Sequence, residues 1–243
     1  MDEGWTRWIL ERQFSEPLRY SSLKDAELRA GNLHANYDAI IIPDQARNSI
    51  LNGHRSGAMP SEYTGGVGEQ GVKALREFVE QGGTLICLNR ASDFAIEQFK
   101  LPIRNVVDGL PRTDFFVPGS ILRIELDTSN PIARGMPKES IAWVENSPVF
   151  EISGTGVSPV NADTQGTTGK MPVPRVKVIA SYPKDNNPLL SGWLLGGDRI
   201  KGKAALVEVG IGKGRIILFG FRPQYRGQSL ATYPLLFNAI SLR

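Results

Sequence analysis

Two short, nearly continuous apolar runs constrain the fold more than any other feature of the sequence. The first run spans Tyr37 to Pro43 and the second spans Thr84 to Leu88. Runs of this kind are typical of strands that are buried on both faces, as in a parallel sheet. Between them, apolar residues recur at helical spacing from 72 to 79, and Gly82 follows as a residue suited to end the helix. Strand, helix and strand in this order predict a doubly wound α/β half.

The flanking segments extend this organisation in both directions. Trp5 and Trp8 begin an apolar face just after two acidic residues, which predicts an opening helix. From 121 to 127 apolar and polar residues alternate, which indicates strands with one solvent-facing side. A glycine-rich connection at 210–214 predicts a hairpin, and residues 230–240 predict a closing amphipathic helix. We therefore expect one α/β domain over residues 1–243.

One segment, 155–174, differs in composition from the rest of the chain. It is rich in proline, glycine and threonine, contains no aromatic residue, and carries only Asp163 and Lys170 as charges. Such a segment cannot offset its ordering entropy by burial. We therefore expect a flexible surface insertion rather than a catalytic lid.

Composition and charge argue against several classes of partner. The 28 basic and 25 acidic side chains leave a net charge of only +3, and the basic residues are scattered, so nucleic acid is not an expected partner. No apolar run approaches the roughly 20 residues that cross a bilayer, so a membrane is not expected either. The N-terminus lacks the pattern of a signal peptide, and the chain as it stands is expected in the cytoplasm.

The turn at 88–92 is the place where an α/β hydrolase would carry its nucleophile. It lacks the flanking glycines that permit a strained nucleophile elbow. Cys87, the single cysteine, falls inside the predicted strand, and Ser92 is interpreted as a helix cap. The two histidines, His34 and His54, both precede this turn and show no zinc-ligand spacing. We therefore expect no catalytic residue, no metal site and no cofactor in this chain.

Two polar stretches remain as weak candidates for ligand binding. They lie at 60–66 and 220–228, at the ends of predicted strands or in loops, where α/β sheets place ligands. Glu62 paired with Arg222 or Arg226 would form either a buried ion pair that fixes the loops or a pocket for a polar ligand. The full set of candidates is Glu62, Tyr63, Arg90, Arg222, Gln224 and Arg226.

Five blocks of sequence, taken in order, resemble the C-terminal module of large bacterial secreted zinc carboxypeptidases of the carboxypeptidase A class. The blocks are Gly4 to Trp8, Pro60 to Gly66, Ser147 to Glu151, Leu190 to Leu195 and Gly220 to Gln224. The resemblance covers nearly the whole chain outside 155–174. It implies a flavodoxin-like, class I glutamine amidotransferase-like three-layer sandwich with extra antiparallel strands in the C-terminal half.

The resemblance also implies features that this chain does not carry. The family has a first strand before Gly4, which this chain is expected to lack, and its zinc belongs to a separate peptidase domain. Neither the peptidase's zinc ligands nor the amidotransferase Cys-His-Glu triad has a counterpart here. Within such a parent protein the module would be periplasmic or secreted.

Three functional hypotheses follow from the sequence. The first is a non-catalytic accessory domain that packs against, or presents substrate to, a zinc carboxypeptidase domain. The second is a binding module for a carbohydrate or peptide at the Glu62 and Arg222 loops. The third is an atypical hydrolase that uses Ser92 or Cys87 with Glu62 and Arg222.

Overall fold

A computed structural model describes residues 1–14, 18–61, 64–153 and 174–242 of the chain. Glu62, Tyr63 and the predicted insertion 155–174, apart from Pro174, lie outside the described residues. The helices are α1 (Asp2–Arg12), α2 (Asp25–Ala30), α3 (Arg47–Asn52), α4 (Gly68–Gln81), α5 (Ala91–Gln98) and α6 (Tyr233–Ser241). Short 3-10 turns are η1 (Leu33–Ala35), η3 (Pro131–Ala133), η4 (Gly197–Arg199), η5 (Tyr225–Gly227) and η6 (Leu230–Thr232).

The strands form one sheet that changes character along its width. They are β1 (Ala39–Ile42), β2 (Thr84–Leu88), β3 (Ile103–Asn105), β4 (Pro118–Leu126), β5 (Glu139–Glu145), β6 (Phe150–Ile152), β7 (Arg175–Ser181), β8 (Leu189–Ser191), β9 (Ala204–Ile211) and β10 (Gly214–Phe219). The order is β1-β2-β10-β9-β7-β4-β5, with β3, β6 and β8 paired off this path. β1 and β10 run parallel to β2, whereas the pairs β10–β9, β9–β7, β7–β4 and β4–β5 are antiparallel.

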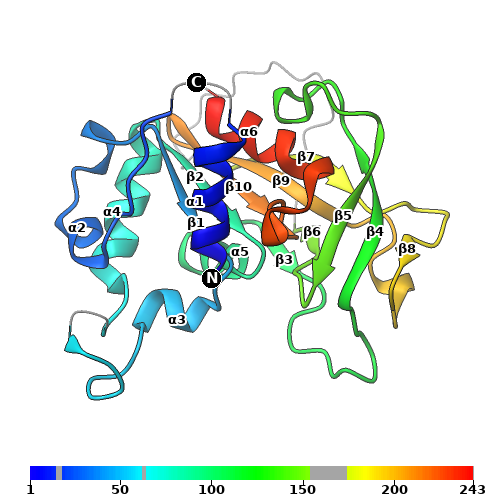
Figure 1. The fold of residues 1–243 in the computed structure, drawn as a ribbon, viewed down its shortest axis with the longest axis horizontal. Helices are drawn as coiled ribbons and strands as arrows, with labels where there is room; N and C mark the ends of the chain where they lie inside the picture. Colours follow the sequence, from blue (N-terminus) through cyan, green and yellow to red (C-terminus); the bar gives the residue numbers. More distant parts are fainter. Residues whose placement is uncertain (15–17, 62–63, 154–173, 243) are drawn as a thin grey trace.

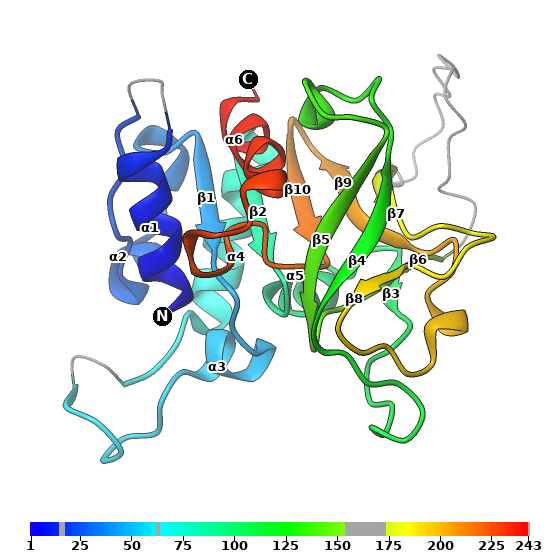
Figure 2. The same ribbon diagram turned by 45° about the vertical axis from the view of Figure 1, so that its right-hand side comes forward.

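Helices cover both faces of the parallel half, and a core lies on each face. Figures 1 and 2 show α1 and α6 together on one side of β1, β2 and β10, with α4 on the other. Along β2, Ile86 and Leu88 join the core under α1 and α6, while Leu85 and Cys87 join the core under α4 and α5. A strand covered on both faces needs apolar side chains at successive positions. The predicted α/β class, with an antiparallel C-terminal half, is therefore confirmed.

The antiparallel half shows the predicted alternation. In β4, Leu122, Ile124 and Leu126 are buried while the residues between them are partly exposed. β9 and β10 form the predicted hairpin through residues 211–214.

No helix in the described part of the chain is both long and apolar enough to cross a membrane. β1 lies at the edge of the sheet, and the expected absence of a preceding strand stays a prediction.

Two expectations about the turn after β2 were wrong. Ser92 does not cap α5, because the helix begins at Ala91 and the Ser92 hydroxyl donates to the carbonyls of Cys87 and Phe219 at 3.3 and 3.1 Å. The strained turn is also present without flanking glycines: Asn89 adopts φ +52°. Asparagine is one of the residues other than glycine that adopt this left-handed conformation most often. The elbow therefore exists, but an asparagine occupies it.

Candidate functional site

The parallel strands β1, β2 and β10 end at the same edge of the sheet, and polar residues follow each of them. Asp44 follows β1, Asn89 and Arg90 follow β2, and Arg222 follows β10. Ligands of open α/β sheets bind outside the carboxyl ends of such strands. This edge is therefore the first place to look for a functional site.

Two arginines share the buried carboxylate of Asp44 at this edge. Arg90 donates from Nε to Oδ1 at 2.9 Å and from Nη2 to Oδ2 at 3.2 Å, and Arg222 donates to Oδ2 as well. The Asp44 side chain has no exposed surface. Burial alone would raise the pKa of Asp44, but the hydrogen bonds from Arg90 and the charge of Arg222 hold it below its usual value. Asp44 is therefore a charged anchor for both arginines.

Arg222 makes two further ion pairs. Its Nε lies 3.1 Å from Asp2 Oδ1 at the start of α1, and its Nη1 donates to Glu145 at the end of β5. Burial would lower the pKa of Arg222, but the surrounding carboxylates raise it. Burial of the Asp2 carboxyl group raises the pKa of Asp2. We call Asp2, Asp44, Arg90, Glu145 and Arg222 the charge cluster; it links α1, β1, β2, β5 and the segment after β10.

Gln224 extends this anchoring to the middle of α1. The side chain is fully buried, and its Nε2 donates to the Thr6 hydroxyl at 2.9 Å. Thr6 in turn donates to the carbonyl of Asp2 at 2.9 Å. Three of the predicted ligand residues, Arg90, Arg222 and Gln224, thus make side-chain contacts within the protein.

Arg226, another predicted ligand residue, has different surroundings. It belongs to η5, where its backbone has φ +50°, and its side chain is exposed. Its guanidinium lies over the Tyr225 ring at 5.3 Å from the centroid. Within the described part of the chain, Arg226 makes no salt bridge.

Aromatic side chains from distant segments meet at this turn. Trp143 of β5 stacks on Tyr225 with ring centroids 4.5 Å apart and an interplanar angle of 15°. Trp5 of α1 meets Tyr225 edge-on at 5.4 Å. Figure 2 shows the segment after β10 lying between α1 and β5, as these contacts require. Tyr225 is therefore the centre of an aromatic cluster.

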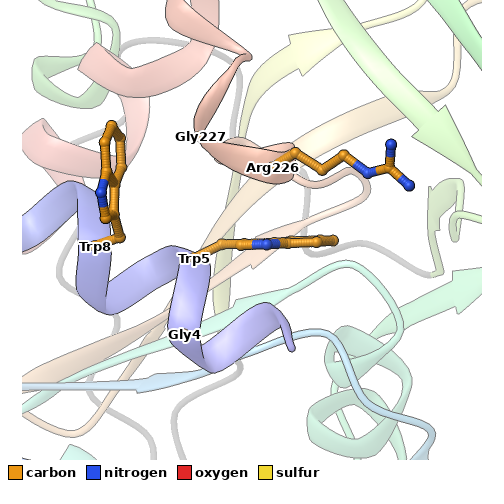
Figure 3. A pocket seen from close by; sticks show the side chains of 5 residues that line it. All are labelled: Gly4, Trp5, Trp8, Arg226 and Gly227. Carbon is orange, nitrogen blue, oxygen red and sulfur yellow. The ribbon is translucent and has the colours of Figure 1, made fainter.

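Two pockets lie beside this cluster. The tryptophan pocket has a volume of about 280 Å³ and is lined by Gly4, Trp5, Trp8, Arg226 and Gly227. The Tyr225 groove has a volume of about 530 Å³, and its lining includes Ile121, Ile141, Trp143, Tyr225, Arg226 and Gln228. Figure 3 shows Trp5 and Arg226 extending in the same direction, with Trp8 standing apart from them. These volumes are at or near the range of about 300 to 1,000 Å³ that is usual for small-ligand sites.

The residues considered as nucleophiles are placed away from these pockets' linings. Cys87 is fully buried within β2, and burial raises the pKa of its thiol. Ser92 is also fully buried. Asn89, at the elbow, is buried as well. Neither the oxygen nor the nitrogen of its side-chain amide has a hydrogen-bond partner among the described residues.

Sequence reasoning found part of this site and missed the rest. Asp44 was missed, although it closely follows the predicted strand that ends at Pro43, a position where α/β sheets place ligands. Trp143 gave no local signal, because an outward-facing aromatic residue in an alternating strand is common. Among the described residues no group of three or more His, Cys, Asp and Glu side chains is arranged to hold a metal ion.

Comparisons with known proteins address the fold. No family model matches the sequence, and no curated protein matches it. A solved structure of a cytoplasmic protein from Salmonella typhimurium LT2 aligns with a TM-score of 0.51 at 14% identity, over 99% of this chain and 87% of its own. A ThuA-like protein from Bacteroides uniformis aligns with a TM-score of 0.47 at 11% identity, over 98% of this chain and 81% of its own.

These similarities concern the fold alone. The alignment with a TM-score of 0.51 shows that the Salmonella protein shares the overall fold of this chain. At such identities no activity or ligand carries over to this chain. The relation to a zinc carboxypeptidase stays a prediction.

Proposed function

We propose that this chain is a non-catalytic module that binds a small polar ligand at the Tyr225 groove and the tryptophan pocket. One observation carries the proposal: aromatic side chains from α1, β5 and η5 converge on Tyr225 beside the exposed Arg226. Small-ligand sites are concave, rich in aromatic side chains, and contain few polar groups that fix orientation. The two pockets combine these properties.

The elbow after β2 supports the non-catalytic part of the proposal. A hydrolase on this fold would present a nucleophile at the turn, with a base within hydrogen-bond reach. Asn89 occupies the turn, and the Ser92 hydroxyl is committed to two backbone carbonyls. An atypical hydrolase built on Ser92 or Cys87 would need to expose side chains that are fully buried.

The charge cluster supports the choice of pocket. A ligand that approached Arg222 would have to displace carboxylates that already surround its guanidinium. Such displacement leaves buried charges unpaired, which costs several kcal/mol. Arg226 needs no such exchange, so it is the better ligand-binding arginine of the two.

A thermal-shift screen of sugars and peptides tests this function. A ligand that binds only the folded state raises the unfolding temperature by mass action. We expect stabilising ligands whose effect disappears in Arg226→Ala. Arg112→Ala is the matched control, because Arg112 is also exposed and lies over an aromatic ring, that of Phe116, at 5.6 Å.

Two results would contradict the binding module. One is a broad screen without any stabilising sugar or peptide. The other is a stabiliser that acts equally on wild type and Arg226→Ala, because its site would then lie elsewhere on the molecule.

We further propose that the module works beside a zinc carboxypeptidase domain of the same parent protein. The support is the resemblance of the five sequence blocks, from Gly4 to Gln224. An in-frame zinc-peptidase domain upstream of Met1 in the genomic sequence is the expected finding. Zinc-dependent release of C-terminal residues by the purified chain itself would contradict the accessory role.

A further inference from the structure

The tryptophan pocket and the Tyr225 groove meet at a single side chain, Arg226, which lines both. Its backbone lies in the left-handed region, with φ +50° and ψ +20°, which is uncommon for a residue other than glycine. The next residue, Gly227, also has a positive φ of +65°. This tight turn places one guanidinium group at the junction between two aromatic-lined cavities.

The charge at this junction is positive and available to a ligand. Arg226 is exposed, and in the described residues the recorded interaction of its guanidinium is the one with Tyr225. Arg222, the other arginine near Tyr225, is surrounded by the carboxylates of the charge cluster. An anionic group on a ligand is therefore the natural complement of Arg226. A carboxylate suits it best, because its two oxygens match the parallel N–H groups of a guanidinium.

The side chains that line both cavities suit sugar rings, which carry polar groups at their edges. Trp8 is 45% exposed, so its indole offers a surface that is open to solvent. A pyranose packs its C–H face on such a ring while its hydroxyl groups remain hydrated or form hydrogen bonds. In the groove, Gln228 and Ser229 offer polar groups for such bonds.

We propose that the ligand is an acidic oligosaccharide, with a uronate carboxylate bound to Arg226 and sugar rings in the tryptophan pocket and the Tyr225 groove. This inference rests on the proposed function and names its ligand class. Two cavities that share one cation in their linings fit a chain of rings better than a single ring. A neutral sugar would leave the arginine without its counter-charge, whereas a peptide would supply a C-terminal carboxylate but no chain of sugar rings for the two cavities.

Isothermal titration calorimetry with trigalacturonate tests the inference. The matched probe is the fully methyl-esterified trimer, which keeps the rings and removes the charge. A tripeptide series forms the third arm. We expect the acid to bind at least ten-fold more tightly than the ester, with an affinity that falls as salt rises.

Variants locate the interaction. Arg226→Ala should abolish the preference for the acid over the ester, and Arg226→Lys should retain part of it. Trp8→Ala should weaken both trimers several-fold, whereas Arg112→Ala should leave both unchanged. Urea unfolding of each variant checks that the fold is intact.

The outcomes separate the inference from the proposed function. Equal binding of acid and ester, or binding of tripeptides alone, would overturn the acidic-oligosaccharide assignment while leaving a ligand-binding module in place. Binding of no member of the three arms or of the wider sugar and peptide screen would overturn the function itself.

Discussion

Arg222 and Arg226 lie four residues apart in the sequence, but their environments are opposite. The Arg222 side chain is 11% exposed and contacts three carboxylates, whereas Arg226 is exposed and makes no salt bridge within the described residues. Buried ion pairs are hard to break because each leaves an unpaired charge behind. The charge cluster therefore fixes the segment after β10 in place, and Arg226 of this segment remains available to a ligand.

The largest expected effect is on the charge-cluster side of this comparison. Asp44→Ala removes the carboxylate that Arg90 and Arg222 share, and we expect a loss of about 3 to 5 kcal/mol in the free energy of unfolding. Urea denaturation measures this loss of stability. Asp114→Ala is the matched control, because its 3.2 Å pair with Arg199 is exposed and should contribute less than about 1 kcal/mol. Equal losses in the two variants would remove the distinction between buried and exposed pairs.

A smaller loss of stability is expected from Gly227→Ala, in the lining of the tryptophan pocket. The added Cβ would lie 3.1 Å from the Trp8 ring, at a position whose φ of +65° disfavours alanine. We expect a cost of about 1 to 2 kcal/mol and a narrowed tryptophan pocket. Gly135→Ala has a similar φ of +77° but no atom within 4 Å, so it isolates the backbone strain. If both variants lose the same stability and ligand binding is unchanged, Gly227 does not shape the pocket.

A pH dependence is expected near the charge cluster from Asp93, whose side chain accepts a hydrogen bond from Asn105 at 2.9 Å. Burial raises the pKa of Asp93 to about 6. The folded state then holds the proton more tightly than the unfolded state, so the free energy of unfolding falls as pH rises from about 4 to about 6.

Asp93→Asn should remove this fall, because asparagine keeps the acceptor oxygen and does not titrate. We compare the free energy of unfolding of the variant with that of wild type at each pH. This difference should shift in favour of the variant by about 1 to 2 kcal/mol between pH 4.5 and pH 7. Thermal unfolding across this pH range measures the difference. Parallel curves for the two proteins would show that Asp93 titrates alike in the folded and unfolded states.

The smallest effect on stability is expected from Arg226→Ala. An exposed side chain without an ion pair in the described structure should change the free energy of unfolding by less than about 0.5 kcal/mol. Urea denaturation beside Arg222→Ala makes the contrast direct, because the second variant removes the arginine that pairs with Asp2 and Glu145 and one of the two arginines that pair with Asp44. A large loss in Arg226→Ala would mean that this arginine is also structural.

The sequence was most informative where burial imposes a local pattern. Thr84–Leu88 was predicted to the residue because a strand covered on both faces must be apolar throughout. The hairpin of β9 and β10 followed from glycines between two apolar runs. Ser92 was misassigned because a serine near a helix start is usually a cap, and only the neighbouring β10 strand supplied the Phe219 carbonyl that it contacts.

The candidate site was less predictable, since its members come from distant segments. Arg222, Gln224 and Arg226 were selected together because they are adjacent in the chain and polar. Nothing local separates the arginine that is buried from the one that is exposed. Trp5 was recognised only as part of a helix, and its contact with Tyr225 depends on how α1 packs against the sheet.

By itself, the sequence determined the parallel α/β half and the antiparallel strands that follow, because these depend on residue type and short-range spacing. The tertiary structure alone decided that Asp44 pairs with both Arg90 and Arg222, and that Tyr225 contacts Trp5 of α1 and Trp143 of β5. The physical reason is that charge pairing and aromatic stacking act across a few ångströms of space, whatever the separation along the chain.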